Sequence, residues 1–291
     1  MRRILLTILF LFTVIPNLQA QTTCDRACLS DFITRYLDAL VAHKPEVLAL
    51  SDKIRFTEDT NEIKLGEGLW KTASKLMPYR QEILDVRQGV AGVHAIVEEN
   101  GIPVMLQVRL KIADRKITEI ETMVVRNQAE GMIFDIAALK TATPAMNAMP
   151  EKSQRQTREE VIRIASLYPA GLKVGSFVTA GTPFAPGAYR LENGRLMAGP
   201  GCTFIAGCDN IKTQGFPRLS GITYRVGAVD EEQGIVWLRQ DFGPGSVMGA
   251  NAASGSLTCW EMFKVYGGSI HAVEAFMEIM PQGTPSGWDA K

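Results

Sequence analysis

Two stretches of the chain, far apart, share one pattern of hydrophobic and polar positions. Residues 110–121 read LKIADRKITEIE and residues 263–274 read FKVYGGSIHAVE, each an apolar alternation, a turn and a second alternation. Side chains along a β-strand point alternately to the two faces of a sheet, so this pattern is typical of strands. The sequence therefore predicts the same β-hairpin twice.

The strands before each hairpin extend the repeat. Asn100-Gly101 lies between two apolar runs, which is a strong signal for a hairpin turn. After it, alternate positions are apolar and share one face of a strand: Ile102, Val104, Leu106, Val108, Leu110 and Ile112. The second copy has GIVWLRQDF and SLTCWEMFKV before its hairpin, with a longer connection between them. Both copies are predicted to be three-stranded meanders.

A helix and an extended stretch precede each meander in the same order. LSDFITRYLDALVAH has apolar residues at helical spacing, and Thr157 to Glu160 fits a capping box that opens a second helix. The extended stretches are IRFTEDTNEIKLGEGLW and AYRLENGRLMAGPG, with Glu58 and Glu192 at matching places. Between the copies, KTATPAMNAMPEKSQRQ lacks periodicity and is predicted to be a linker.

The repeated order predicts an α+β fold of two tandem cone-shaped units. Each unit is expected to be a strongly bent antiparallel sheet with helices on its concave side, where side chains either fill the cone or line a pocket. The first unit is expected over residues 21–139, the linker over 140–156 and the second unit over 157–291.

The N-terminus predicts export. MRRILLTILFLFTVIPNLQA has two arginines before an apolar run and ends in an acceptable cleavage site, so residues 1–20 are predicted to be a secretory signal peptide. The alternative is a membrane helix, but the run is too short to span about 30 Å of hydrocarbon. The mature protein is expected to be periplasmic or extracellular and free of the membrane.

Five cysteines in an exported chain predict disulfides. The favoured pairs are Cys24 with Cys28 and Cys202 with Cys208, which leaves Cys259 as a free, buried thiol. A Cys202–Cys259 bridge is the main alternative. The chain has 31 basic and 31 acidic residues, and no basic stripe with interleaved aromatics, so nucleic-acid binding is not expected.

Several segments together resemble a known family. CDRACL, YLDALVAH, RFTEDTNEIKLGEGLW and PQGTPSGW resemble exported tandem proteins built from nuclear-transport-factor-two-like (SnoaL-like) units, over nearly the whole mature chain. The chain is more loosely similar to cofactor-free diarylpropane and phenylcoumaran lyases, which release formaldehyde from lignin-derived dimers. The resemblance implies a cone that holds an apolar ligand, but fold does not define a reaction.

Familiar cofactor chemistries lack their motifs. The three histidines, His43, His94 and His271, form no HxxxH pair, and His271 and Glu274 point to opposite faces of a strand. Without a Cys/His cluster zinc is not expected. No phosphate-binding glycine loop and no G-x-S-x-G motif occurs. We therefore expect no metal and no cofactor, only acid/base groups in a pocket.

Four residues are candidate catalytic groups. Glu58 could be a base, His94 a proton shuttle and Arg109 a stabiliser of a phenolate or enolate. Asp241 shares a strand face with Arg239, as pocket groups or as a lateral ion pair; Arg190 and Glu192 repeat that spacing with the same two interpretations. The competing interpretation of each candidate is a surface or structural residue.

Six further residues are candidate ligand contacts: Tyr36, Trp70, Tyr79, Gln107, Trp237 and Trp260. For the aromatic ones the competing interpretation is core packing. Two functions follow from the sequence. The first is a cofactor-independent lyase or dehydratase for a small aromatic alcohol. The second is a non-catalytic exported module that binds a hydrophobic small molecule, with its two copies packed as a pseudo-dimer. A homo-oligomer through the sheet faces is the expected protein partnership.

Overall fold

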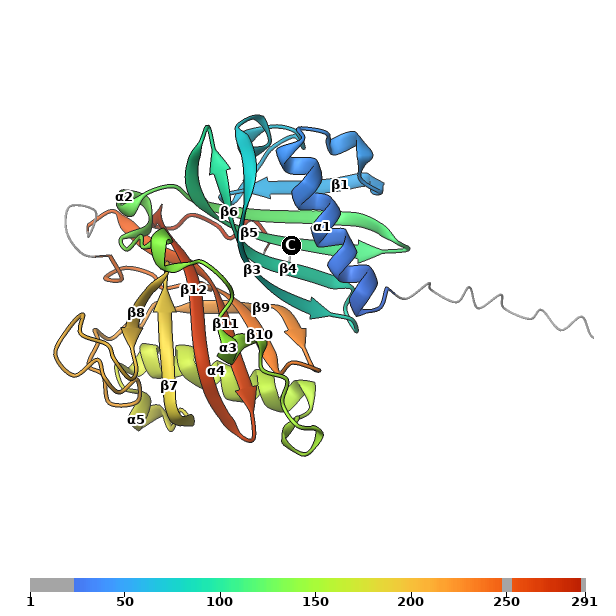
Figure 1. The fold of residues 1–291 in the computed structure, drawn as a ribbon. Helices are drawn as coiled ribbons and strands as arrows, with labels where there is room; N and C mark the ends of the chain where they lie inside the picture. Colours follow the sequence, from blue (N-terminus) through green and yellow to red (C-terminus); the bar gives the residue numbers. More distant parts are fainter. Residues whose placement is uncertain (1–23, 248–252, 289–291) are drawn as a thin grey trace, which may run out of the picture.

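A computed structural model describes residues 24–247 and 253–288 of the chain. The predicted signal segment, residues 1–20, lies outside these residues. Two six-stranded sheets form the bulk of the protein (Figure 1), with strand orders β2-β1-β6-β5-β4-β3 and β8-β7-β12-β11-β10-β9. The strands of the first sheet are β1 (Leu50–Glu58), β2 (Asn61–Glu62), β3 (Ala73–Asp85), β4 (Val90–Glu99), β5 (Ile102–Ala113) and β6 (Lys116–Val125). Those of the second are β7 (Phe184–Glu192), β8 (Arg195–Ala198), β9 (Thr223–Asp230), β10 (Ile235–Asp241), β11 (Gly255–Tyr266) and β12 (Ser269–Pro281).

The prediction of an α+β protein with two sheet units is confirmed, but two of its details are wrong. The sheets are mixed rather than antiparallel, because β1 pairs parallel with β6 and β7 pairs parallel with β12. Such pairs join strands that are distant in sequence, so no local pattern reveals them. The sheets are also not strongly curled (Figure 1). Curvature depends on bulges and packing, which an alternation pattern does not determine.

Each meander has four strands, one more than predicted, and the two predicted hairpins have the same geometry. The turns Asp114-Arg115 and Gly267-Gly268 have positive φ at both residues, as a two-residue hairpin turn requires. The register then shifts by one residue in both copies, leaving Thr118 and His271 as the extra residues of a bulge. The repeat therefore extends to its irregularities, so the hydrogen-bond registers identify equivalent positions in the two sheets.

One long helix covers one face of each sheet, which we call the helix face. Helix α1 (Arg26–Val41) packs with Leu29, Ile33 and Tyr36 on the first sheet, and α4 (Arg158–Val174) packs on the second. Half of the predicted capping box is formed: the Thr157 hydroxyl accepts the N–H of Glu160 at 3.2 Å, while the Glu160 carboxylate accepts from Arg163 at 3.0 and 2.8 Å. The short helices are α2 (Gln128–Gly131), α3 (Pro144–Asn147) and α5 (Phe177–Ala180), with 3-10 turns at 45–47, 68–71, 136–138 and 152–154.

The opposite faces of the two sheets pack against each other, and we call these the contact faces. Their shared core contains side chains from both sheets: Tyr79, Ile83, Met105, Met123, Trp237, Trp260, Met262 and Phe276. The approach is close enough that a side chain at Gly92 would meet the Trp237 ring at 2.2 Å. We call the first sheet with α1 the first unit and the second sheet with α4 the second unit.

Reciprocal polar contacts join the two units. The first residue of α1, Arg26, bonds Asp230 at the end of β9 at 2.6 Å. The first residue of α4, Arg158, bonds Asp85 at the end of β3 at 2.9 and 2.6 Å. Each aspartate also accepts a backbone N–H from the other unit: Asp230 from Leu84 at 3.2 Å, and Asp85 from Val229 at 2.9 Å. This exchange is the pattern of a two-fold dimer interface, within one chain.

The segment predicted as the linker lies against the contact face of the second sheet. Met146 is fully buried, and the buried Lys264 ammonium donates to the carbonyls of Met146, at 3.0 Å, and Ala148. Thr143 donates to Glu274 at 2.6 Å. The last described residues run back to the first unit (Figure 1), where the Trp288 indole donates to Thr57 at 2.7 Å.

Both favoured cysteine pairs form disulfides, Cys24–Cys28 and Cys202–Cys208, and Cys259 is a buried free thiol. Disulfides of this kind persist in oxidising compartments. Among the helices of residues 24–247 and 253–288, none is long and apolar enough to cross a membrane.

Candidate functional site

The predicted base Glu58 supports a turn in the first unit. Its buried carboxylate accepts the N–H of Leu69 at 2.9 and 3.2 Å, and Arg126 lies 3.7 Å away. Burial raises the pKa of Glu58 to about 7, although the hydrogen bond from the Leu69 N–H lowers it. Gly68 has a positive φ, and a Cβ there would lie 2.4 Å from the carboxylate. Glu58 therefore holds the 3-10 turn that carries Leu69 and Trp70.

Trp70 and Tyr36 close the helix face of the first unit. Both are 1% exposed, and their rings meet edge to face with centroids 5.3 Å apart. Their contacts belong to a continuous apolar core under α1. Two predicted ligand contacts thus come together, but as core packing.

Five predicted site residues lie on the contact faces. The His94 ring stacks on Phe276 at a centroid distance of 4.3 Å and accepts the Trp237 indole N–H at 3.3 Å. Burial lowers the pKa of His94 to about 3, so the imidazole is neutral across the physiological range. Tyr79, Gln107, Trp237 and Trp260 are buried in the same layer. His94 and the three aromatic residues therefore join the sheets, whereas Gln107 bonds the Glu121 carbonyl of its own sheet at 3.5 Å.

Arg109 and Asp241 are occupied by local ion pairs. Arg109 pairs with Glu119 at 2.9 Å and donates to the Gly227 carbonyl at 3.4 Å. Asp241 accepts from Arg239 at 2.7 Å and from Thr258 at 2.6 Å, the lateral pair that the sequence allowed. None of the ten predicted catalytic and ligand-binding side chains lines the cavity of the second unit.

That cavity lies on the helix face of the second sheet and has a volume of about 250 Å³. Its wall is mostly apolar: Met132, Leu172, Met197, Phe204, Ile205, Phe216, Leu219, Phe242, Leu257 and Met277. Five polar side chains also line it: Tyr168, Arg190, Glu192, Gln214 and Ser246. An apolar cavity with a few convergent polar groups is the usual form of a small-molecule site.

Arg190 is the centre of the polar side chains. It is 7% exposed and donates to the Tyr168 hydroxyl at 3.1 Å and to the Gln214 side chain at 3.0 Å. Its Nε lies 2.8 Å from a Glu192 oxygen, an ion pair in which the N–H is not aimed at the carboxylate. Among the described residues, Arg190 Nε is one of the buried atoms without a hydrogen-bond partner. Its charge is therefore held beside Glu192 rather than in a regular hydrogen bond.

Glu261, on β11, extends this group behind Tyr168. Its carboxyl is 2% exposed, is hydrogen-bonded by Tyr168 and accepts from the Gln240 amide. Burial, with the nearby charge of Glu192, raises the pKa of Glu261 to about 8, so it holds a proton at neutral pH. We call Tyr168, Arg190, Glu192, Gln214, Gln240 and Glu261 the polar cluster.

The first unit has no counterpart of most of the polar cluster. The strand registers place Phe56 opposite Ile120 and Arg190 opposite Val273, equivalent points of the two sheets. The registers of the neighbouring strands then give the equivalent residues of the two units: Phe56 and Arg190, Ala95 and Gln240, Leu106 and Cys259, and Val108 and Glu261. Glu58 and Glu192 are equivalent, as the sequence predicted. Four helix-face positions that are apolar in the first unit are therefore polar or thiol in the second.

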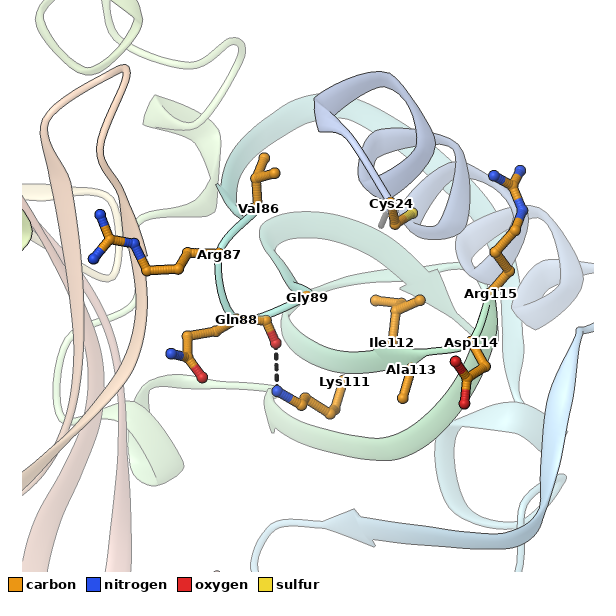
Figure 2. Close-up of a pocket in the computed structure, with 10 residues that line it drawn as sticks. All are labelled: Cys24, Val86, Arg87, Gln88, Gly89, Lys111, Ile112, Ala113, Asp114 and Arg115. Carbon is orange, nitrogen blue, oxygen red and sulfur yellow. Dashed lines mark hydrogen bonds between the residues drawn. The ribbon is translucent and has the colours of Figure 1, made fainter. Parts of the chain in front are cut away.

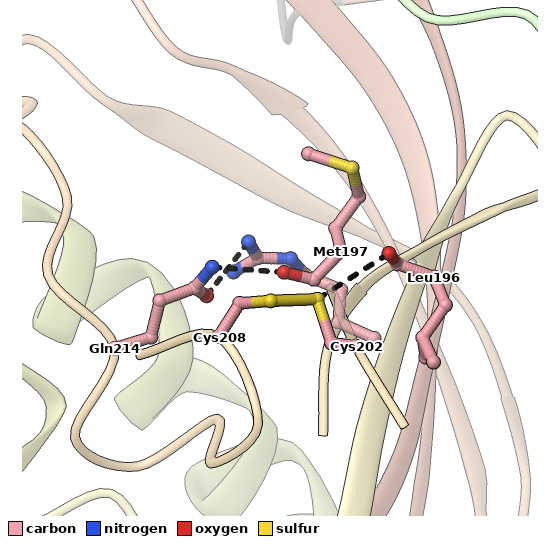
Figure 3. The surroundings of a disulfide bond; sticks show 6 residues. Leu196, Met197, Cys202, Cys208 and Gln214 are labelled. Carbon is pink, nitrogen blue, oxygen red and sulfur yellow. Dashed lines mark hydrogen bonds between the residues drawn. A yellow bond between two sulfur atoms is a disulfide. The ribbon is translucent and has the colours of Figure 1, made fainter. Parts of the chain in front are cut away.

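The connection that follows β2 in the first unit differs from the one that follows β8 in the second unit. In the first, residues 63–72 bring Trp70 over Tyr36. In the second, residues 199–222 contain no helix or strand. Gln214, in this segment, donates its amide N–H to the Met197 carbonyl of β8 at 2.8 Å (Figure 3). Tyr36 and Tyr168 occupy the same position, the eleventh residue, of α1 and α4. The first unit fills the space that the second leaves open.

A separate polar pocket of about 270 Å³ lies in the first unit (Figure 2). It is formed by the turn 86–89 and the hairpin 111–115, beside Cys24. Its Lys111 ammonium already donates to the Gln88 carbonyl, and Arg87 pairs with Glu231 at 2.7 Å. These contacts occupy Lys111 and Arg87, and the other charged side chains of the pocket, Asp114 and Arg115, lie at the exposed hairpin turn.

In the described ranges, no group of three or more His, Cys, Asp or Glu side chains is arranged to hold a metal ion.

Sequence reasoning noted Arg190 and Glu192 but left their role open, and it missed Tyr168, Gln240 and Glu261. A signal for Glu261 does exist: in SLTCWEMFKV it is the acidic residue of an otherwise largely apolar strand. Burying a carboxyl group costs free energy unless it is paired or hydrogen-bonded, so an acidic residue in an apolar strand indicates a polar partner or a functional site.

Comparisons with known proteins bear on the second unit. A family model described as a domain of unknown function (DUF8021) matches residues 154–277, which contain the whole polar cluster. No curated protein matches the chain. Among solved structures the chain is similar to a de novo designed protein with a curved β-sheet, at 20% identity and a TM-score of 0.30, over 34% of this chain and 87% of that one.

Proposed function

We propose that the protein is a cofactor-independent lyase or dehydratase that acts on a small aromatic alcohol in the cavity of the second unit. The observation that carries this proposal is the polar cluster, which stands at the end of an apolar cavity in the second unit. Three of its members, Arg190, Gln240 and Glu261, are replaced by apolar residues in the first unit. The resemblance to SnoaL-like proteins and the two disulfides support an exported enzyme of this kind.

The size of the cavity favours a ligand with one ring. Ligand pockets usually have volumes from about 300 Å³ upward, and this one has about 250 Å³. A two-ring lignin dimer would need a larger space, so a single aromatic ring with a short oxygenated side chain is the better candidate. Three methionines, Met132, Met197 and Met277, offer sulfur contacts to such a ring.

The geometry suits the loss of water from a β-hydroxy ketone. Glu192 would remove a proton from the carbon between the carbonyl and the alcohol, and the electron pair would move to the carbonyl oxygen beside Arg190. When the pair returns to form the carbon–carbon double bond, the hydroxyl leaves as water with a proton from Glu261, relayed by Tyr168. Proton return from Glu192 to Glu261 restores the site.

The test is dehydration of 4-hydroxy-4-phenylbutan-2-one, followed by the absorbance of the enone product. We expect turnover by the wild-type protein with a chelator present, and at least a hundredfold loss of kcat in Glu192→Gln and Glu261→Gln, as is usual for a lost acid or base. Glu58→Gln is the matched control, because Glu58 is the equivalent carboxylate of the first unit. Equal losses in Glu58→Gln and Glu192→Gln would refute the assignment to the second unit.

The second candidate function is a binding module. The apolar wall of the cavity favours it independently of the acid/base groups. Its test is binding of 2-naphthol, a neutral fluorescent phenol, by fluorescence titration. Saturable binding without turnover of any β-hydroxy ketone would support the module over the enzyme.

A further inference from the structure

The mouth of the cavity is formed by a disulfide-closed loop. Phe204 and Ile205 line the cavity yet are 36% and 45% exposed, so they lie at its edge. Both belong to the segment 202–208, which the Cys202–Cys208 bond closes and which we call the disulfide loop. Large exposed apolar side chains beside an apolar cavity are typical of a ligand entrance.

The base of the disulfide loop is buried, whereas its tip is exposed and has one ring contact, the Arg195 guanidinium over Phe204 at 4.8 Å. Cys202 and Cys208 are 8% and 1% exposed, and Gly199 N–H donates to the Cys208 carbonyl at 2.7 Å. The Cys202 sulfur also contacts the Leu196 carbonyl at 3.6 Å (Figure 3). At the tip, residues 203–207 are all exposed. The disulfide therefore decides where Phe204 and Ile205 stand.

The surrounding segment connects this entrance to the polar cluster. Residues 199–222 have no helix or strand, and a connection this long inside a compact domain usually serves a function. Gln214, in the same segment, bonds both Arg190 at 3.0 Å and the Met197 carbonyl at 2.8 Å (Figure 3). With little regular structure, the covalent bond is a main restraint on its conformations.

We propose that the disulfide loop is the entrance of the second-unit cavity and that the site binds its ligand tightly only while Cys202–Cys208 is oxidised. This rests on the proposed function, because the ligand is that of the cavity. A dithiol reductant would donate two electrons and two protons to the bond, giving two cysteine thiols and the oxidised reductant. Phe204 and Ile205 would then leave the mouth, and the ligand would escape faster.

The experiment is titration of the whole protein with 2-naphthol before and after reduction by dithiothreitol. We expect the affinity to fall by about tenfold or more in the reduced protein and in the double variant Cys202→Ser/Cys208→Ser. The double variant Cys24→Ser/Cys28→Ser, which removes the other disulfide, is expected to bind as the wild type does. Hydrogen exchange measured alongside should rise in residues 199–222 and stay unchanged in β11 and β12.

If exchange rises throughout, the fold has been lost and a second pair of variants decides. Phe204→Ala/Ile205→Ala keeps the disulfide and should speed 2-naphthol dissociation, whereas Val47→Ala/Val178→Ala, at two exposed apolar positions elsewhere, should not. Equal binding by oxidised and reduced wild-type protein would overturn the entrance proposal alone. No binding by either form would overturn the cavity function and the entrance with it.

Discussion

At the scale of single residues, Arg190 distinguishes the two copies. Its equivalent in the first unit is Phe56, and the change from a ring to a guanidinium on the same sheet face brings Tyr168, Glu192 and Gln214 together around a charge. A buried arginine is stable only with such partners. The same partners hold its planar fork in one orientation toward the cavity.

Replacing Arg190 by lysine tests this role. Lysine keeps the charge but cannot bond Tyr168 and Gln214 with a rigid fork. We expect Arg190→Lys to fold and to bind 2-naphthol about tenfold more weakly, as measured by fluorescence titration. Arg163→Lys, at an exposed arginine of α4 that does not line the cavity, is the control. Unchanged binding in Arg190→Lys would mean that the guanidinium does not orient the ligand.

At the scale of elements, the connection between the second and third strands of each sheet decides whether the helix face is filled. The first unit uses a short connection with a 3-10 turn, held by Glu58, that inserts Trp70. The second uses residues 199–222, closed in part by a disulfide. The two units therefore have the same strand order and matching bulges, but the core under the helix is filled in the first unit and contains a cavity in the second.

Trp70→Ala separates core packing from ligand binding. Removing a buried indole should lower the free energy of unfolding by about 3–5 kcal/mol, measured by urea unfolding. Binding of 2-naphthol to the second unit, measured where the variant is folded, should stay within twofold of wild type. Loss of binding in folded Trp70→Ala would instead restore Trp70 as a ligand contact.

At the scale of the whole molecule, the two units are joined as a two-fold dimer would be. Arg26 with Asp230 and Arg158 with Asp85 exchange equivalent bonds, and the contact faces share one apolar core. Because the connection between the units is covalent, the interface forms without the translational and rotational cost of association.

The reciprocity predicts matched effects of two substitutions. Asp85→Ala and Asp230→Ala each remove a buried carboxylate that bonds an arginine and a backbone N–H of the other unit, which should cost about 3–5 kcal/mol in urea unfolding. Arg26 keeps a second carboxylate partner, the more exposed Glu232, at 3.2 Å. The two losses should agree within about 1 kcal/mol, which is near the spread of context effects for one interaction. Asp52→Ala, at an exposed position of β1, is the control. A large effect of one substitution and none of the other would refute the reciprocity.

Buried carboxyls make stability depend on pH. Burial raises the pKa of Glu261 to about 8 and, helped by the charge of Asp59, that of Glu278 to about 9. Both hold a proton in the folded state at pH 7 and lose it on unfolding. The folded state therefore binds more protons, and the free energy of unfolding should fall as pH rises from 6.5 to 8, by about 1–3 kcal/mol per pH unit.

This window isolates the carboxyls. Unfolding changes the protonation of His94 at pH values below its ordinary pKa of 6.5. Burial lowers the pKa of Lys264 to about 8, so unfolding changes the protonation of Lys264 above pH 8. Guanidinium unfolding at pH 6.5 and 8 measures the slope. Glu261→Gln and Glu278→Gln should each make it shallower by up to about 1.4 kcal/mol per pH unit, and a wild-type slope of the opposite sign would contradict the assignment.

The sequence by itself predicted three of the four strands of each meander, the paired hairpins and the helix that opens at Thr157, because these follow from periodicity and turn residues. It favoured the two disulfides that form, from their short separations, but left a Cys202–Cys259 bridge open. It also placed Glu58 and Glu192 at equivalent positions. Only the tertiary structure decided the parallel closing pairs and which face of each strand meets the other sheet. Alternation shows that two faces differ, not what covers each one. For that reason His94 and Trp237 lie between the sheets, while Arg190, Glu192 and Glu261 surround a cavity that no local pattern announces.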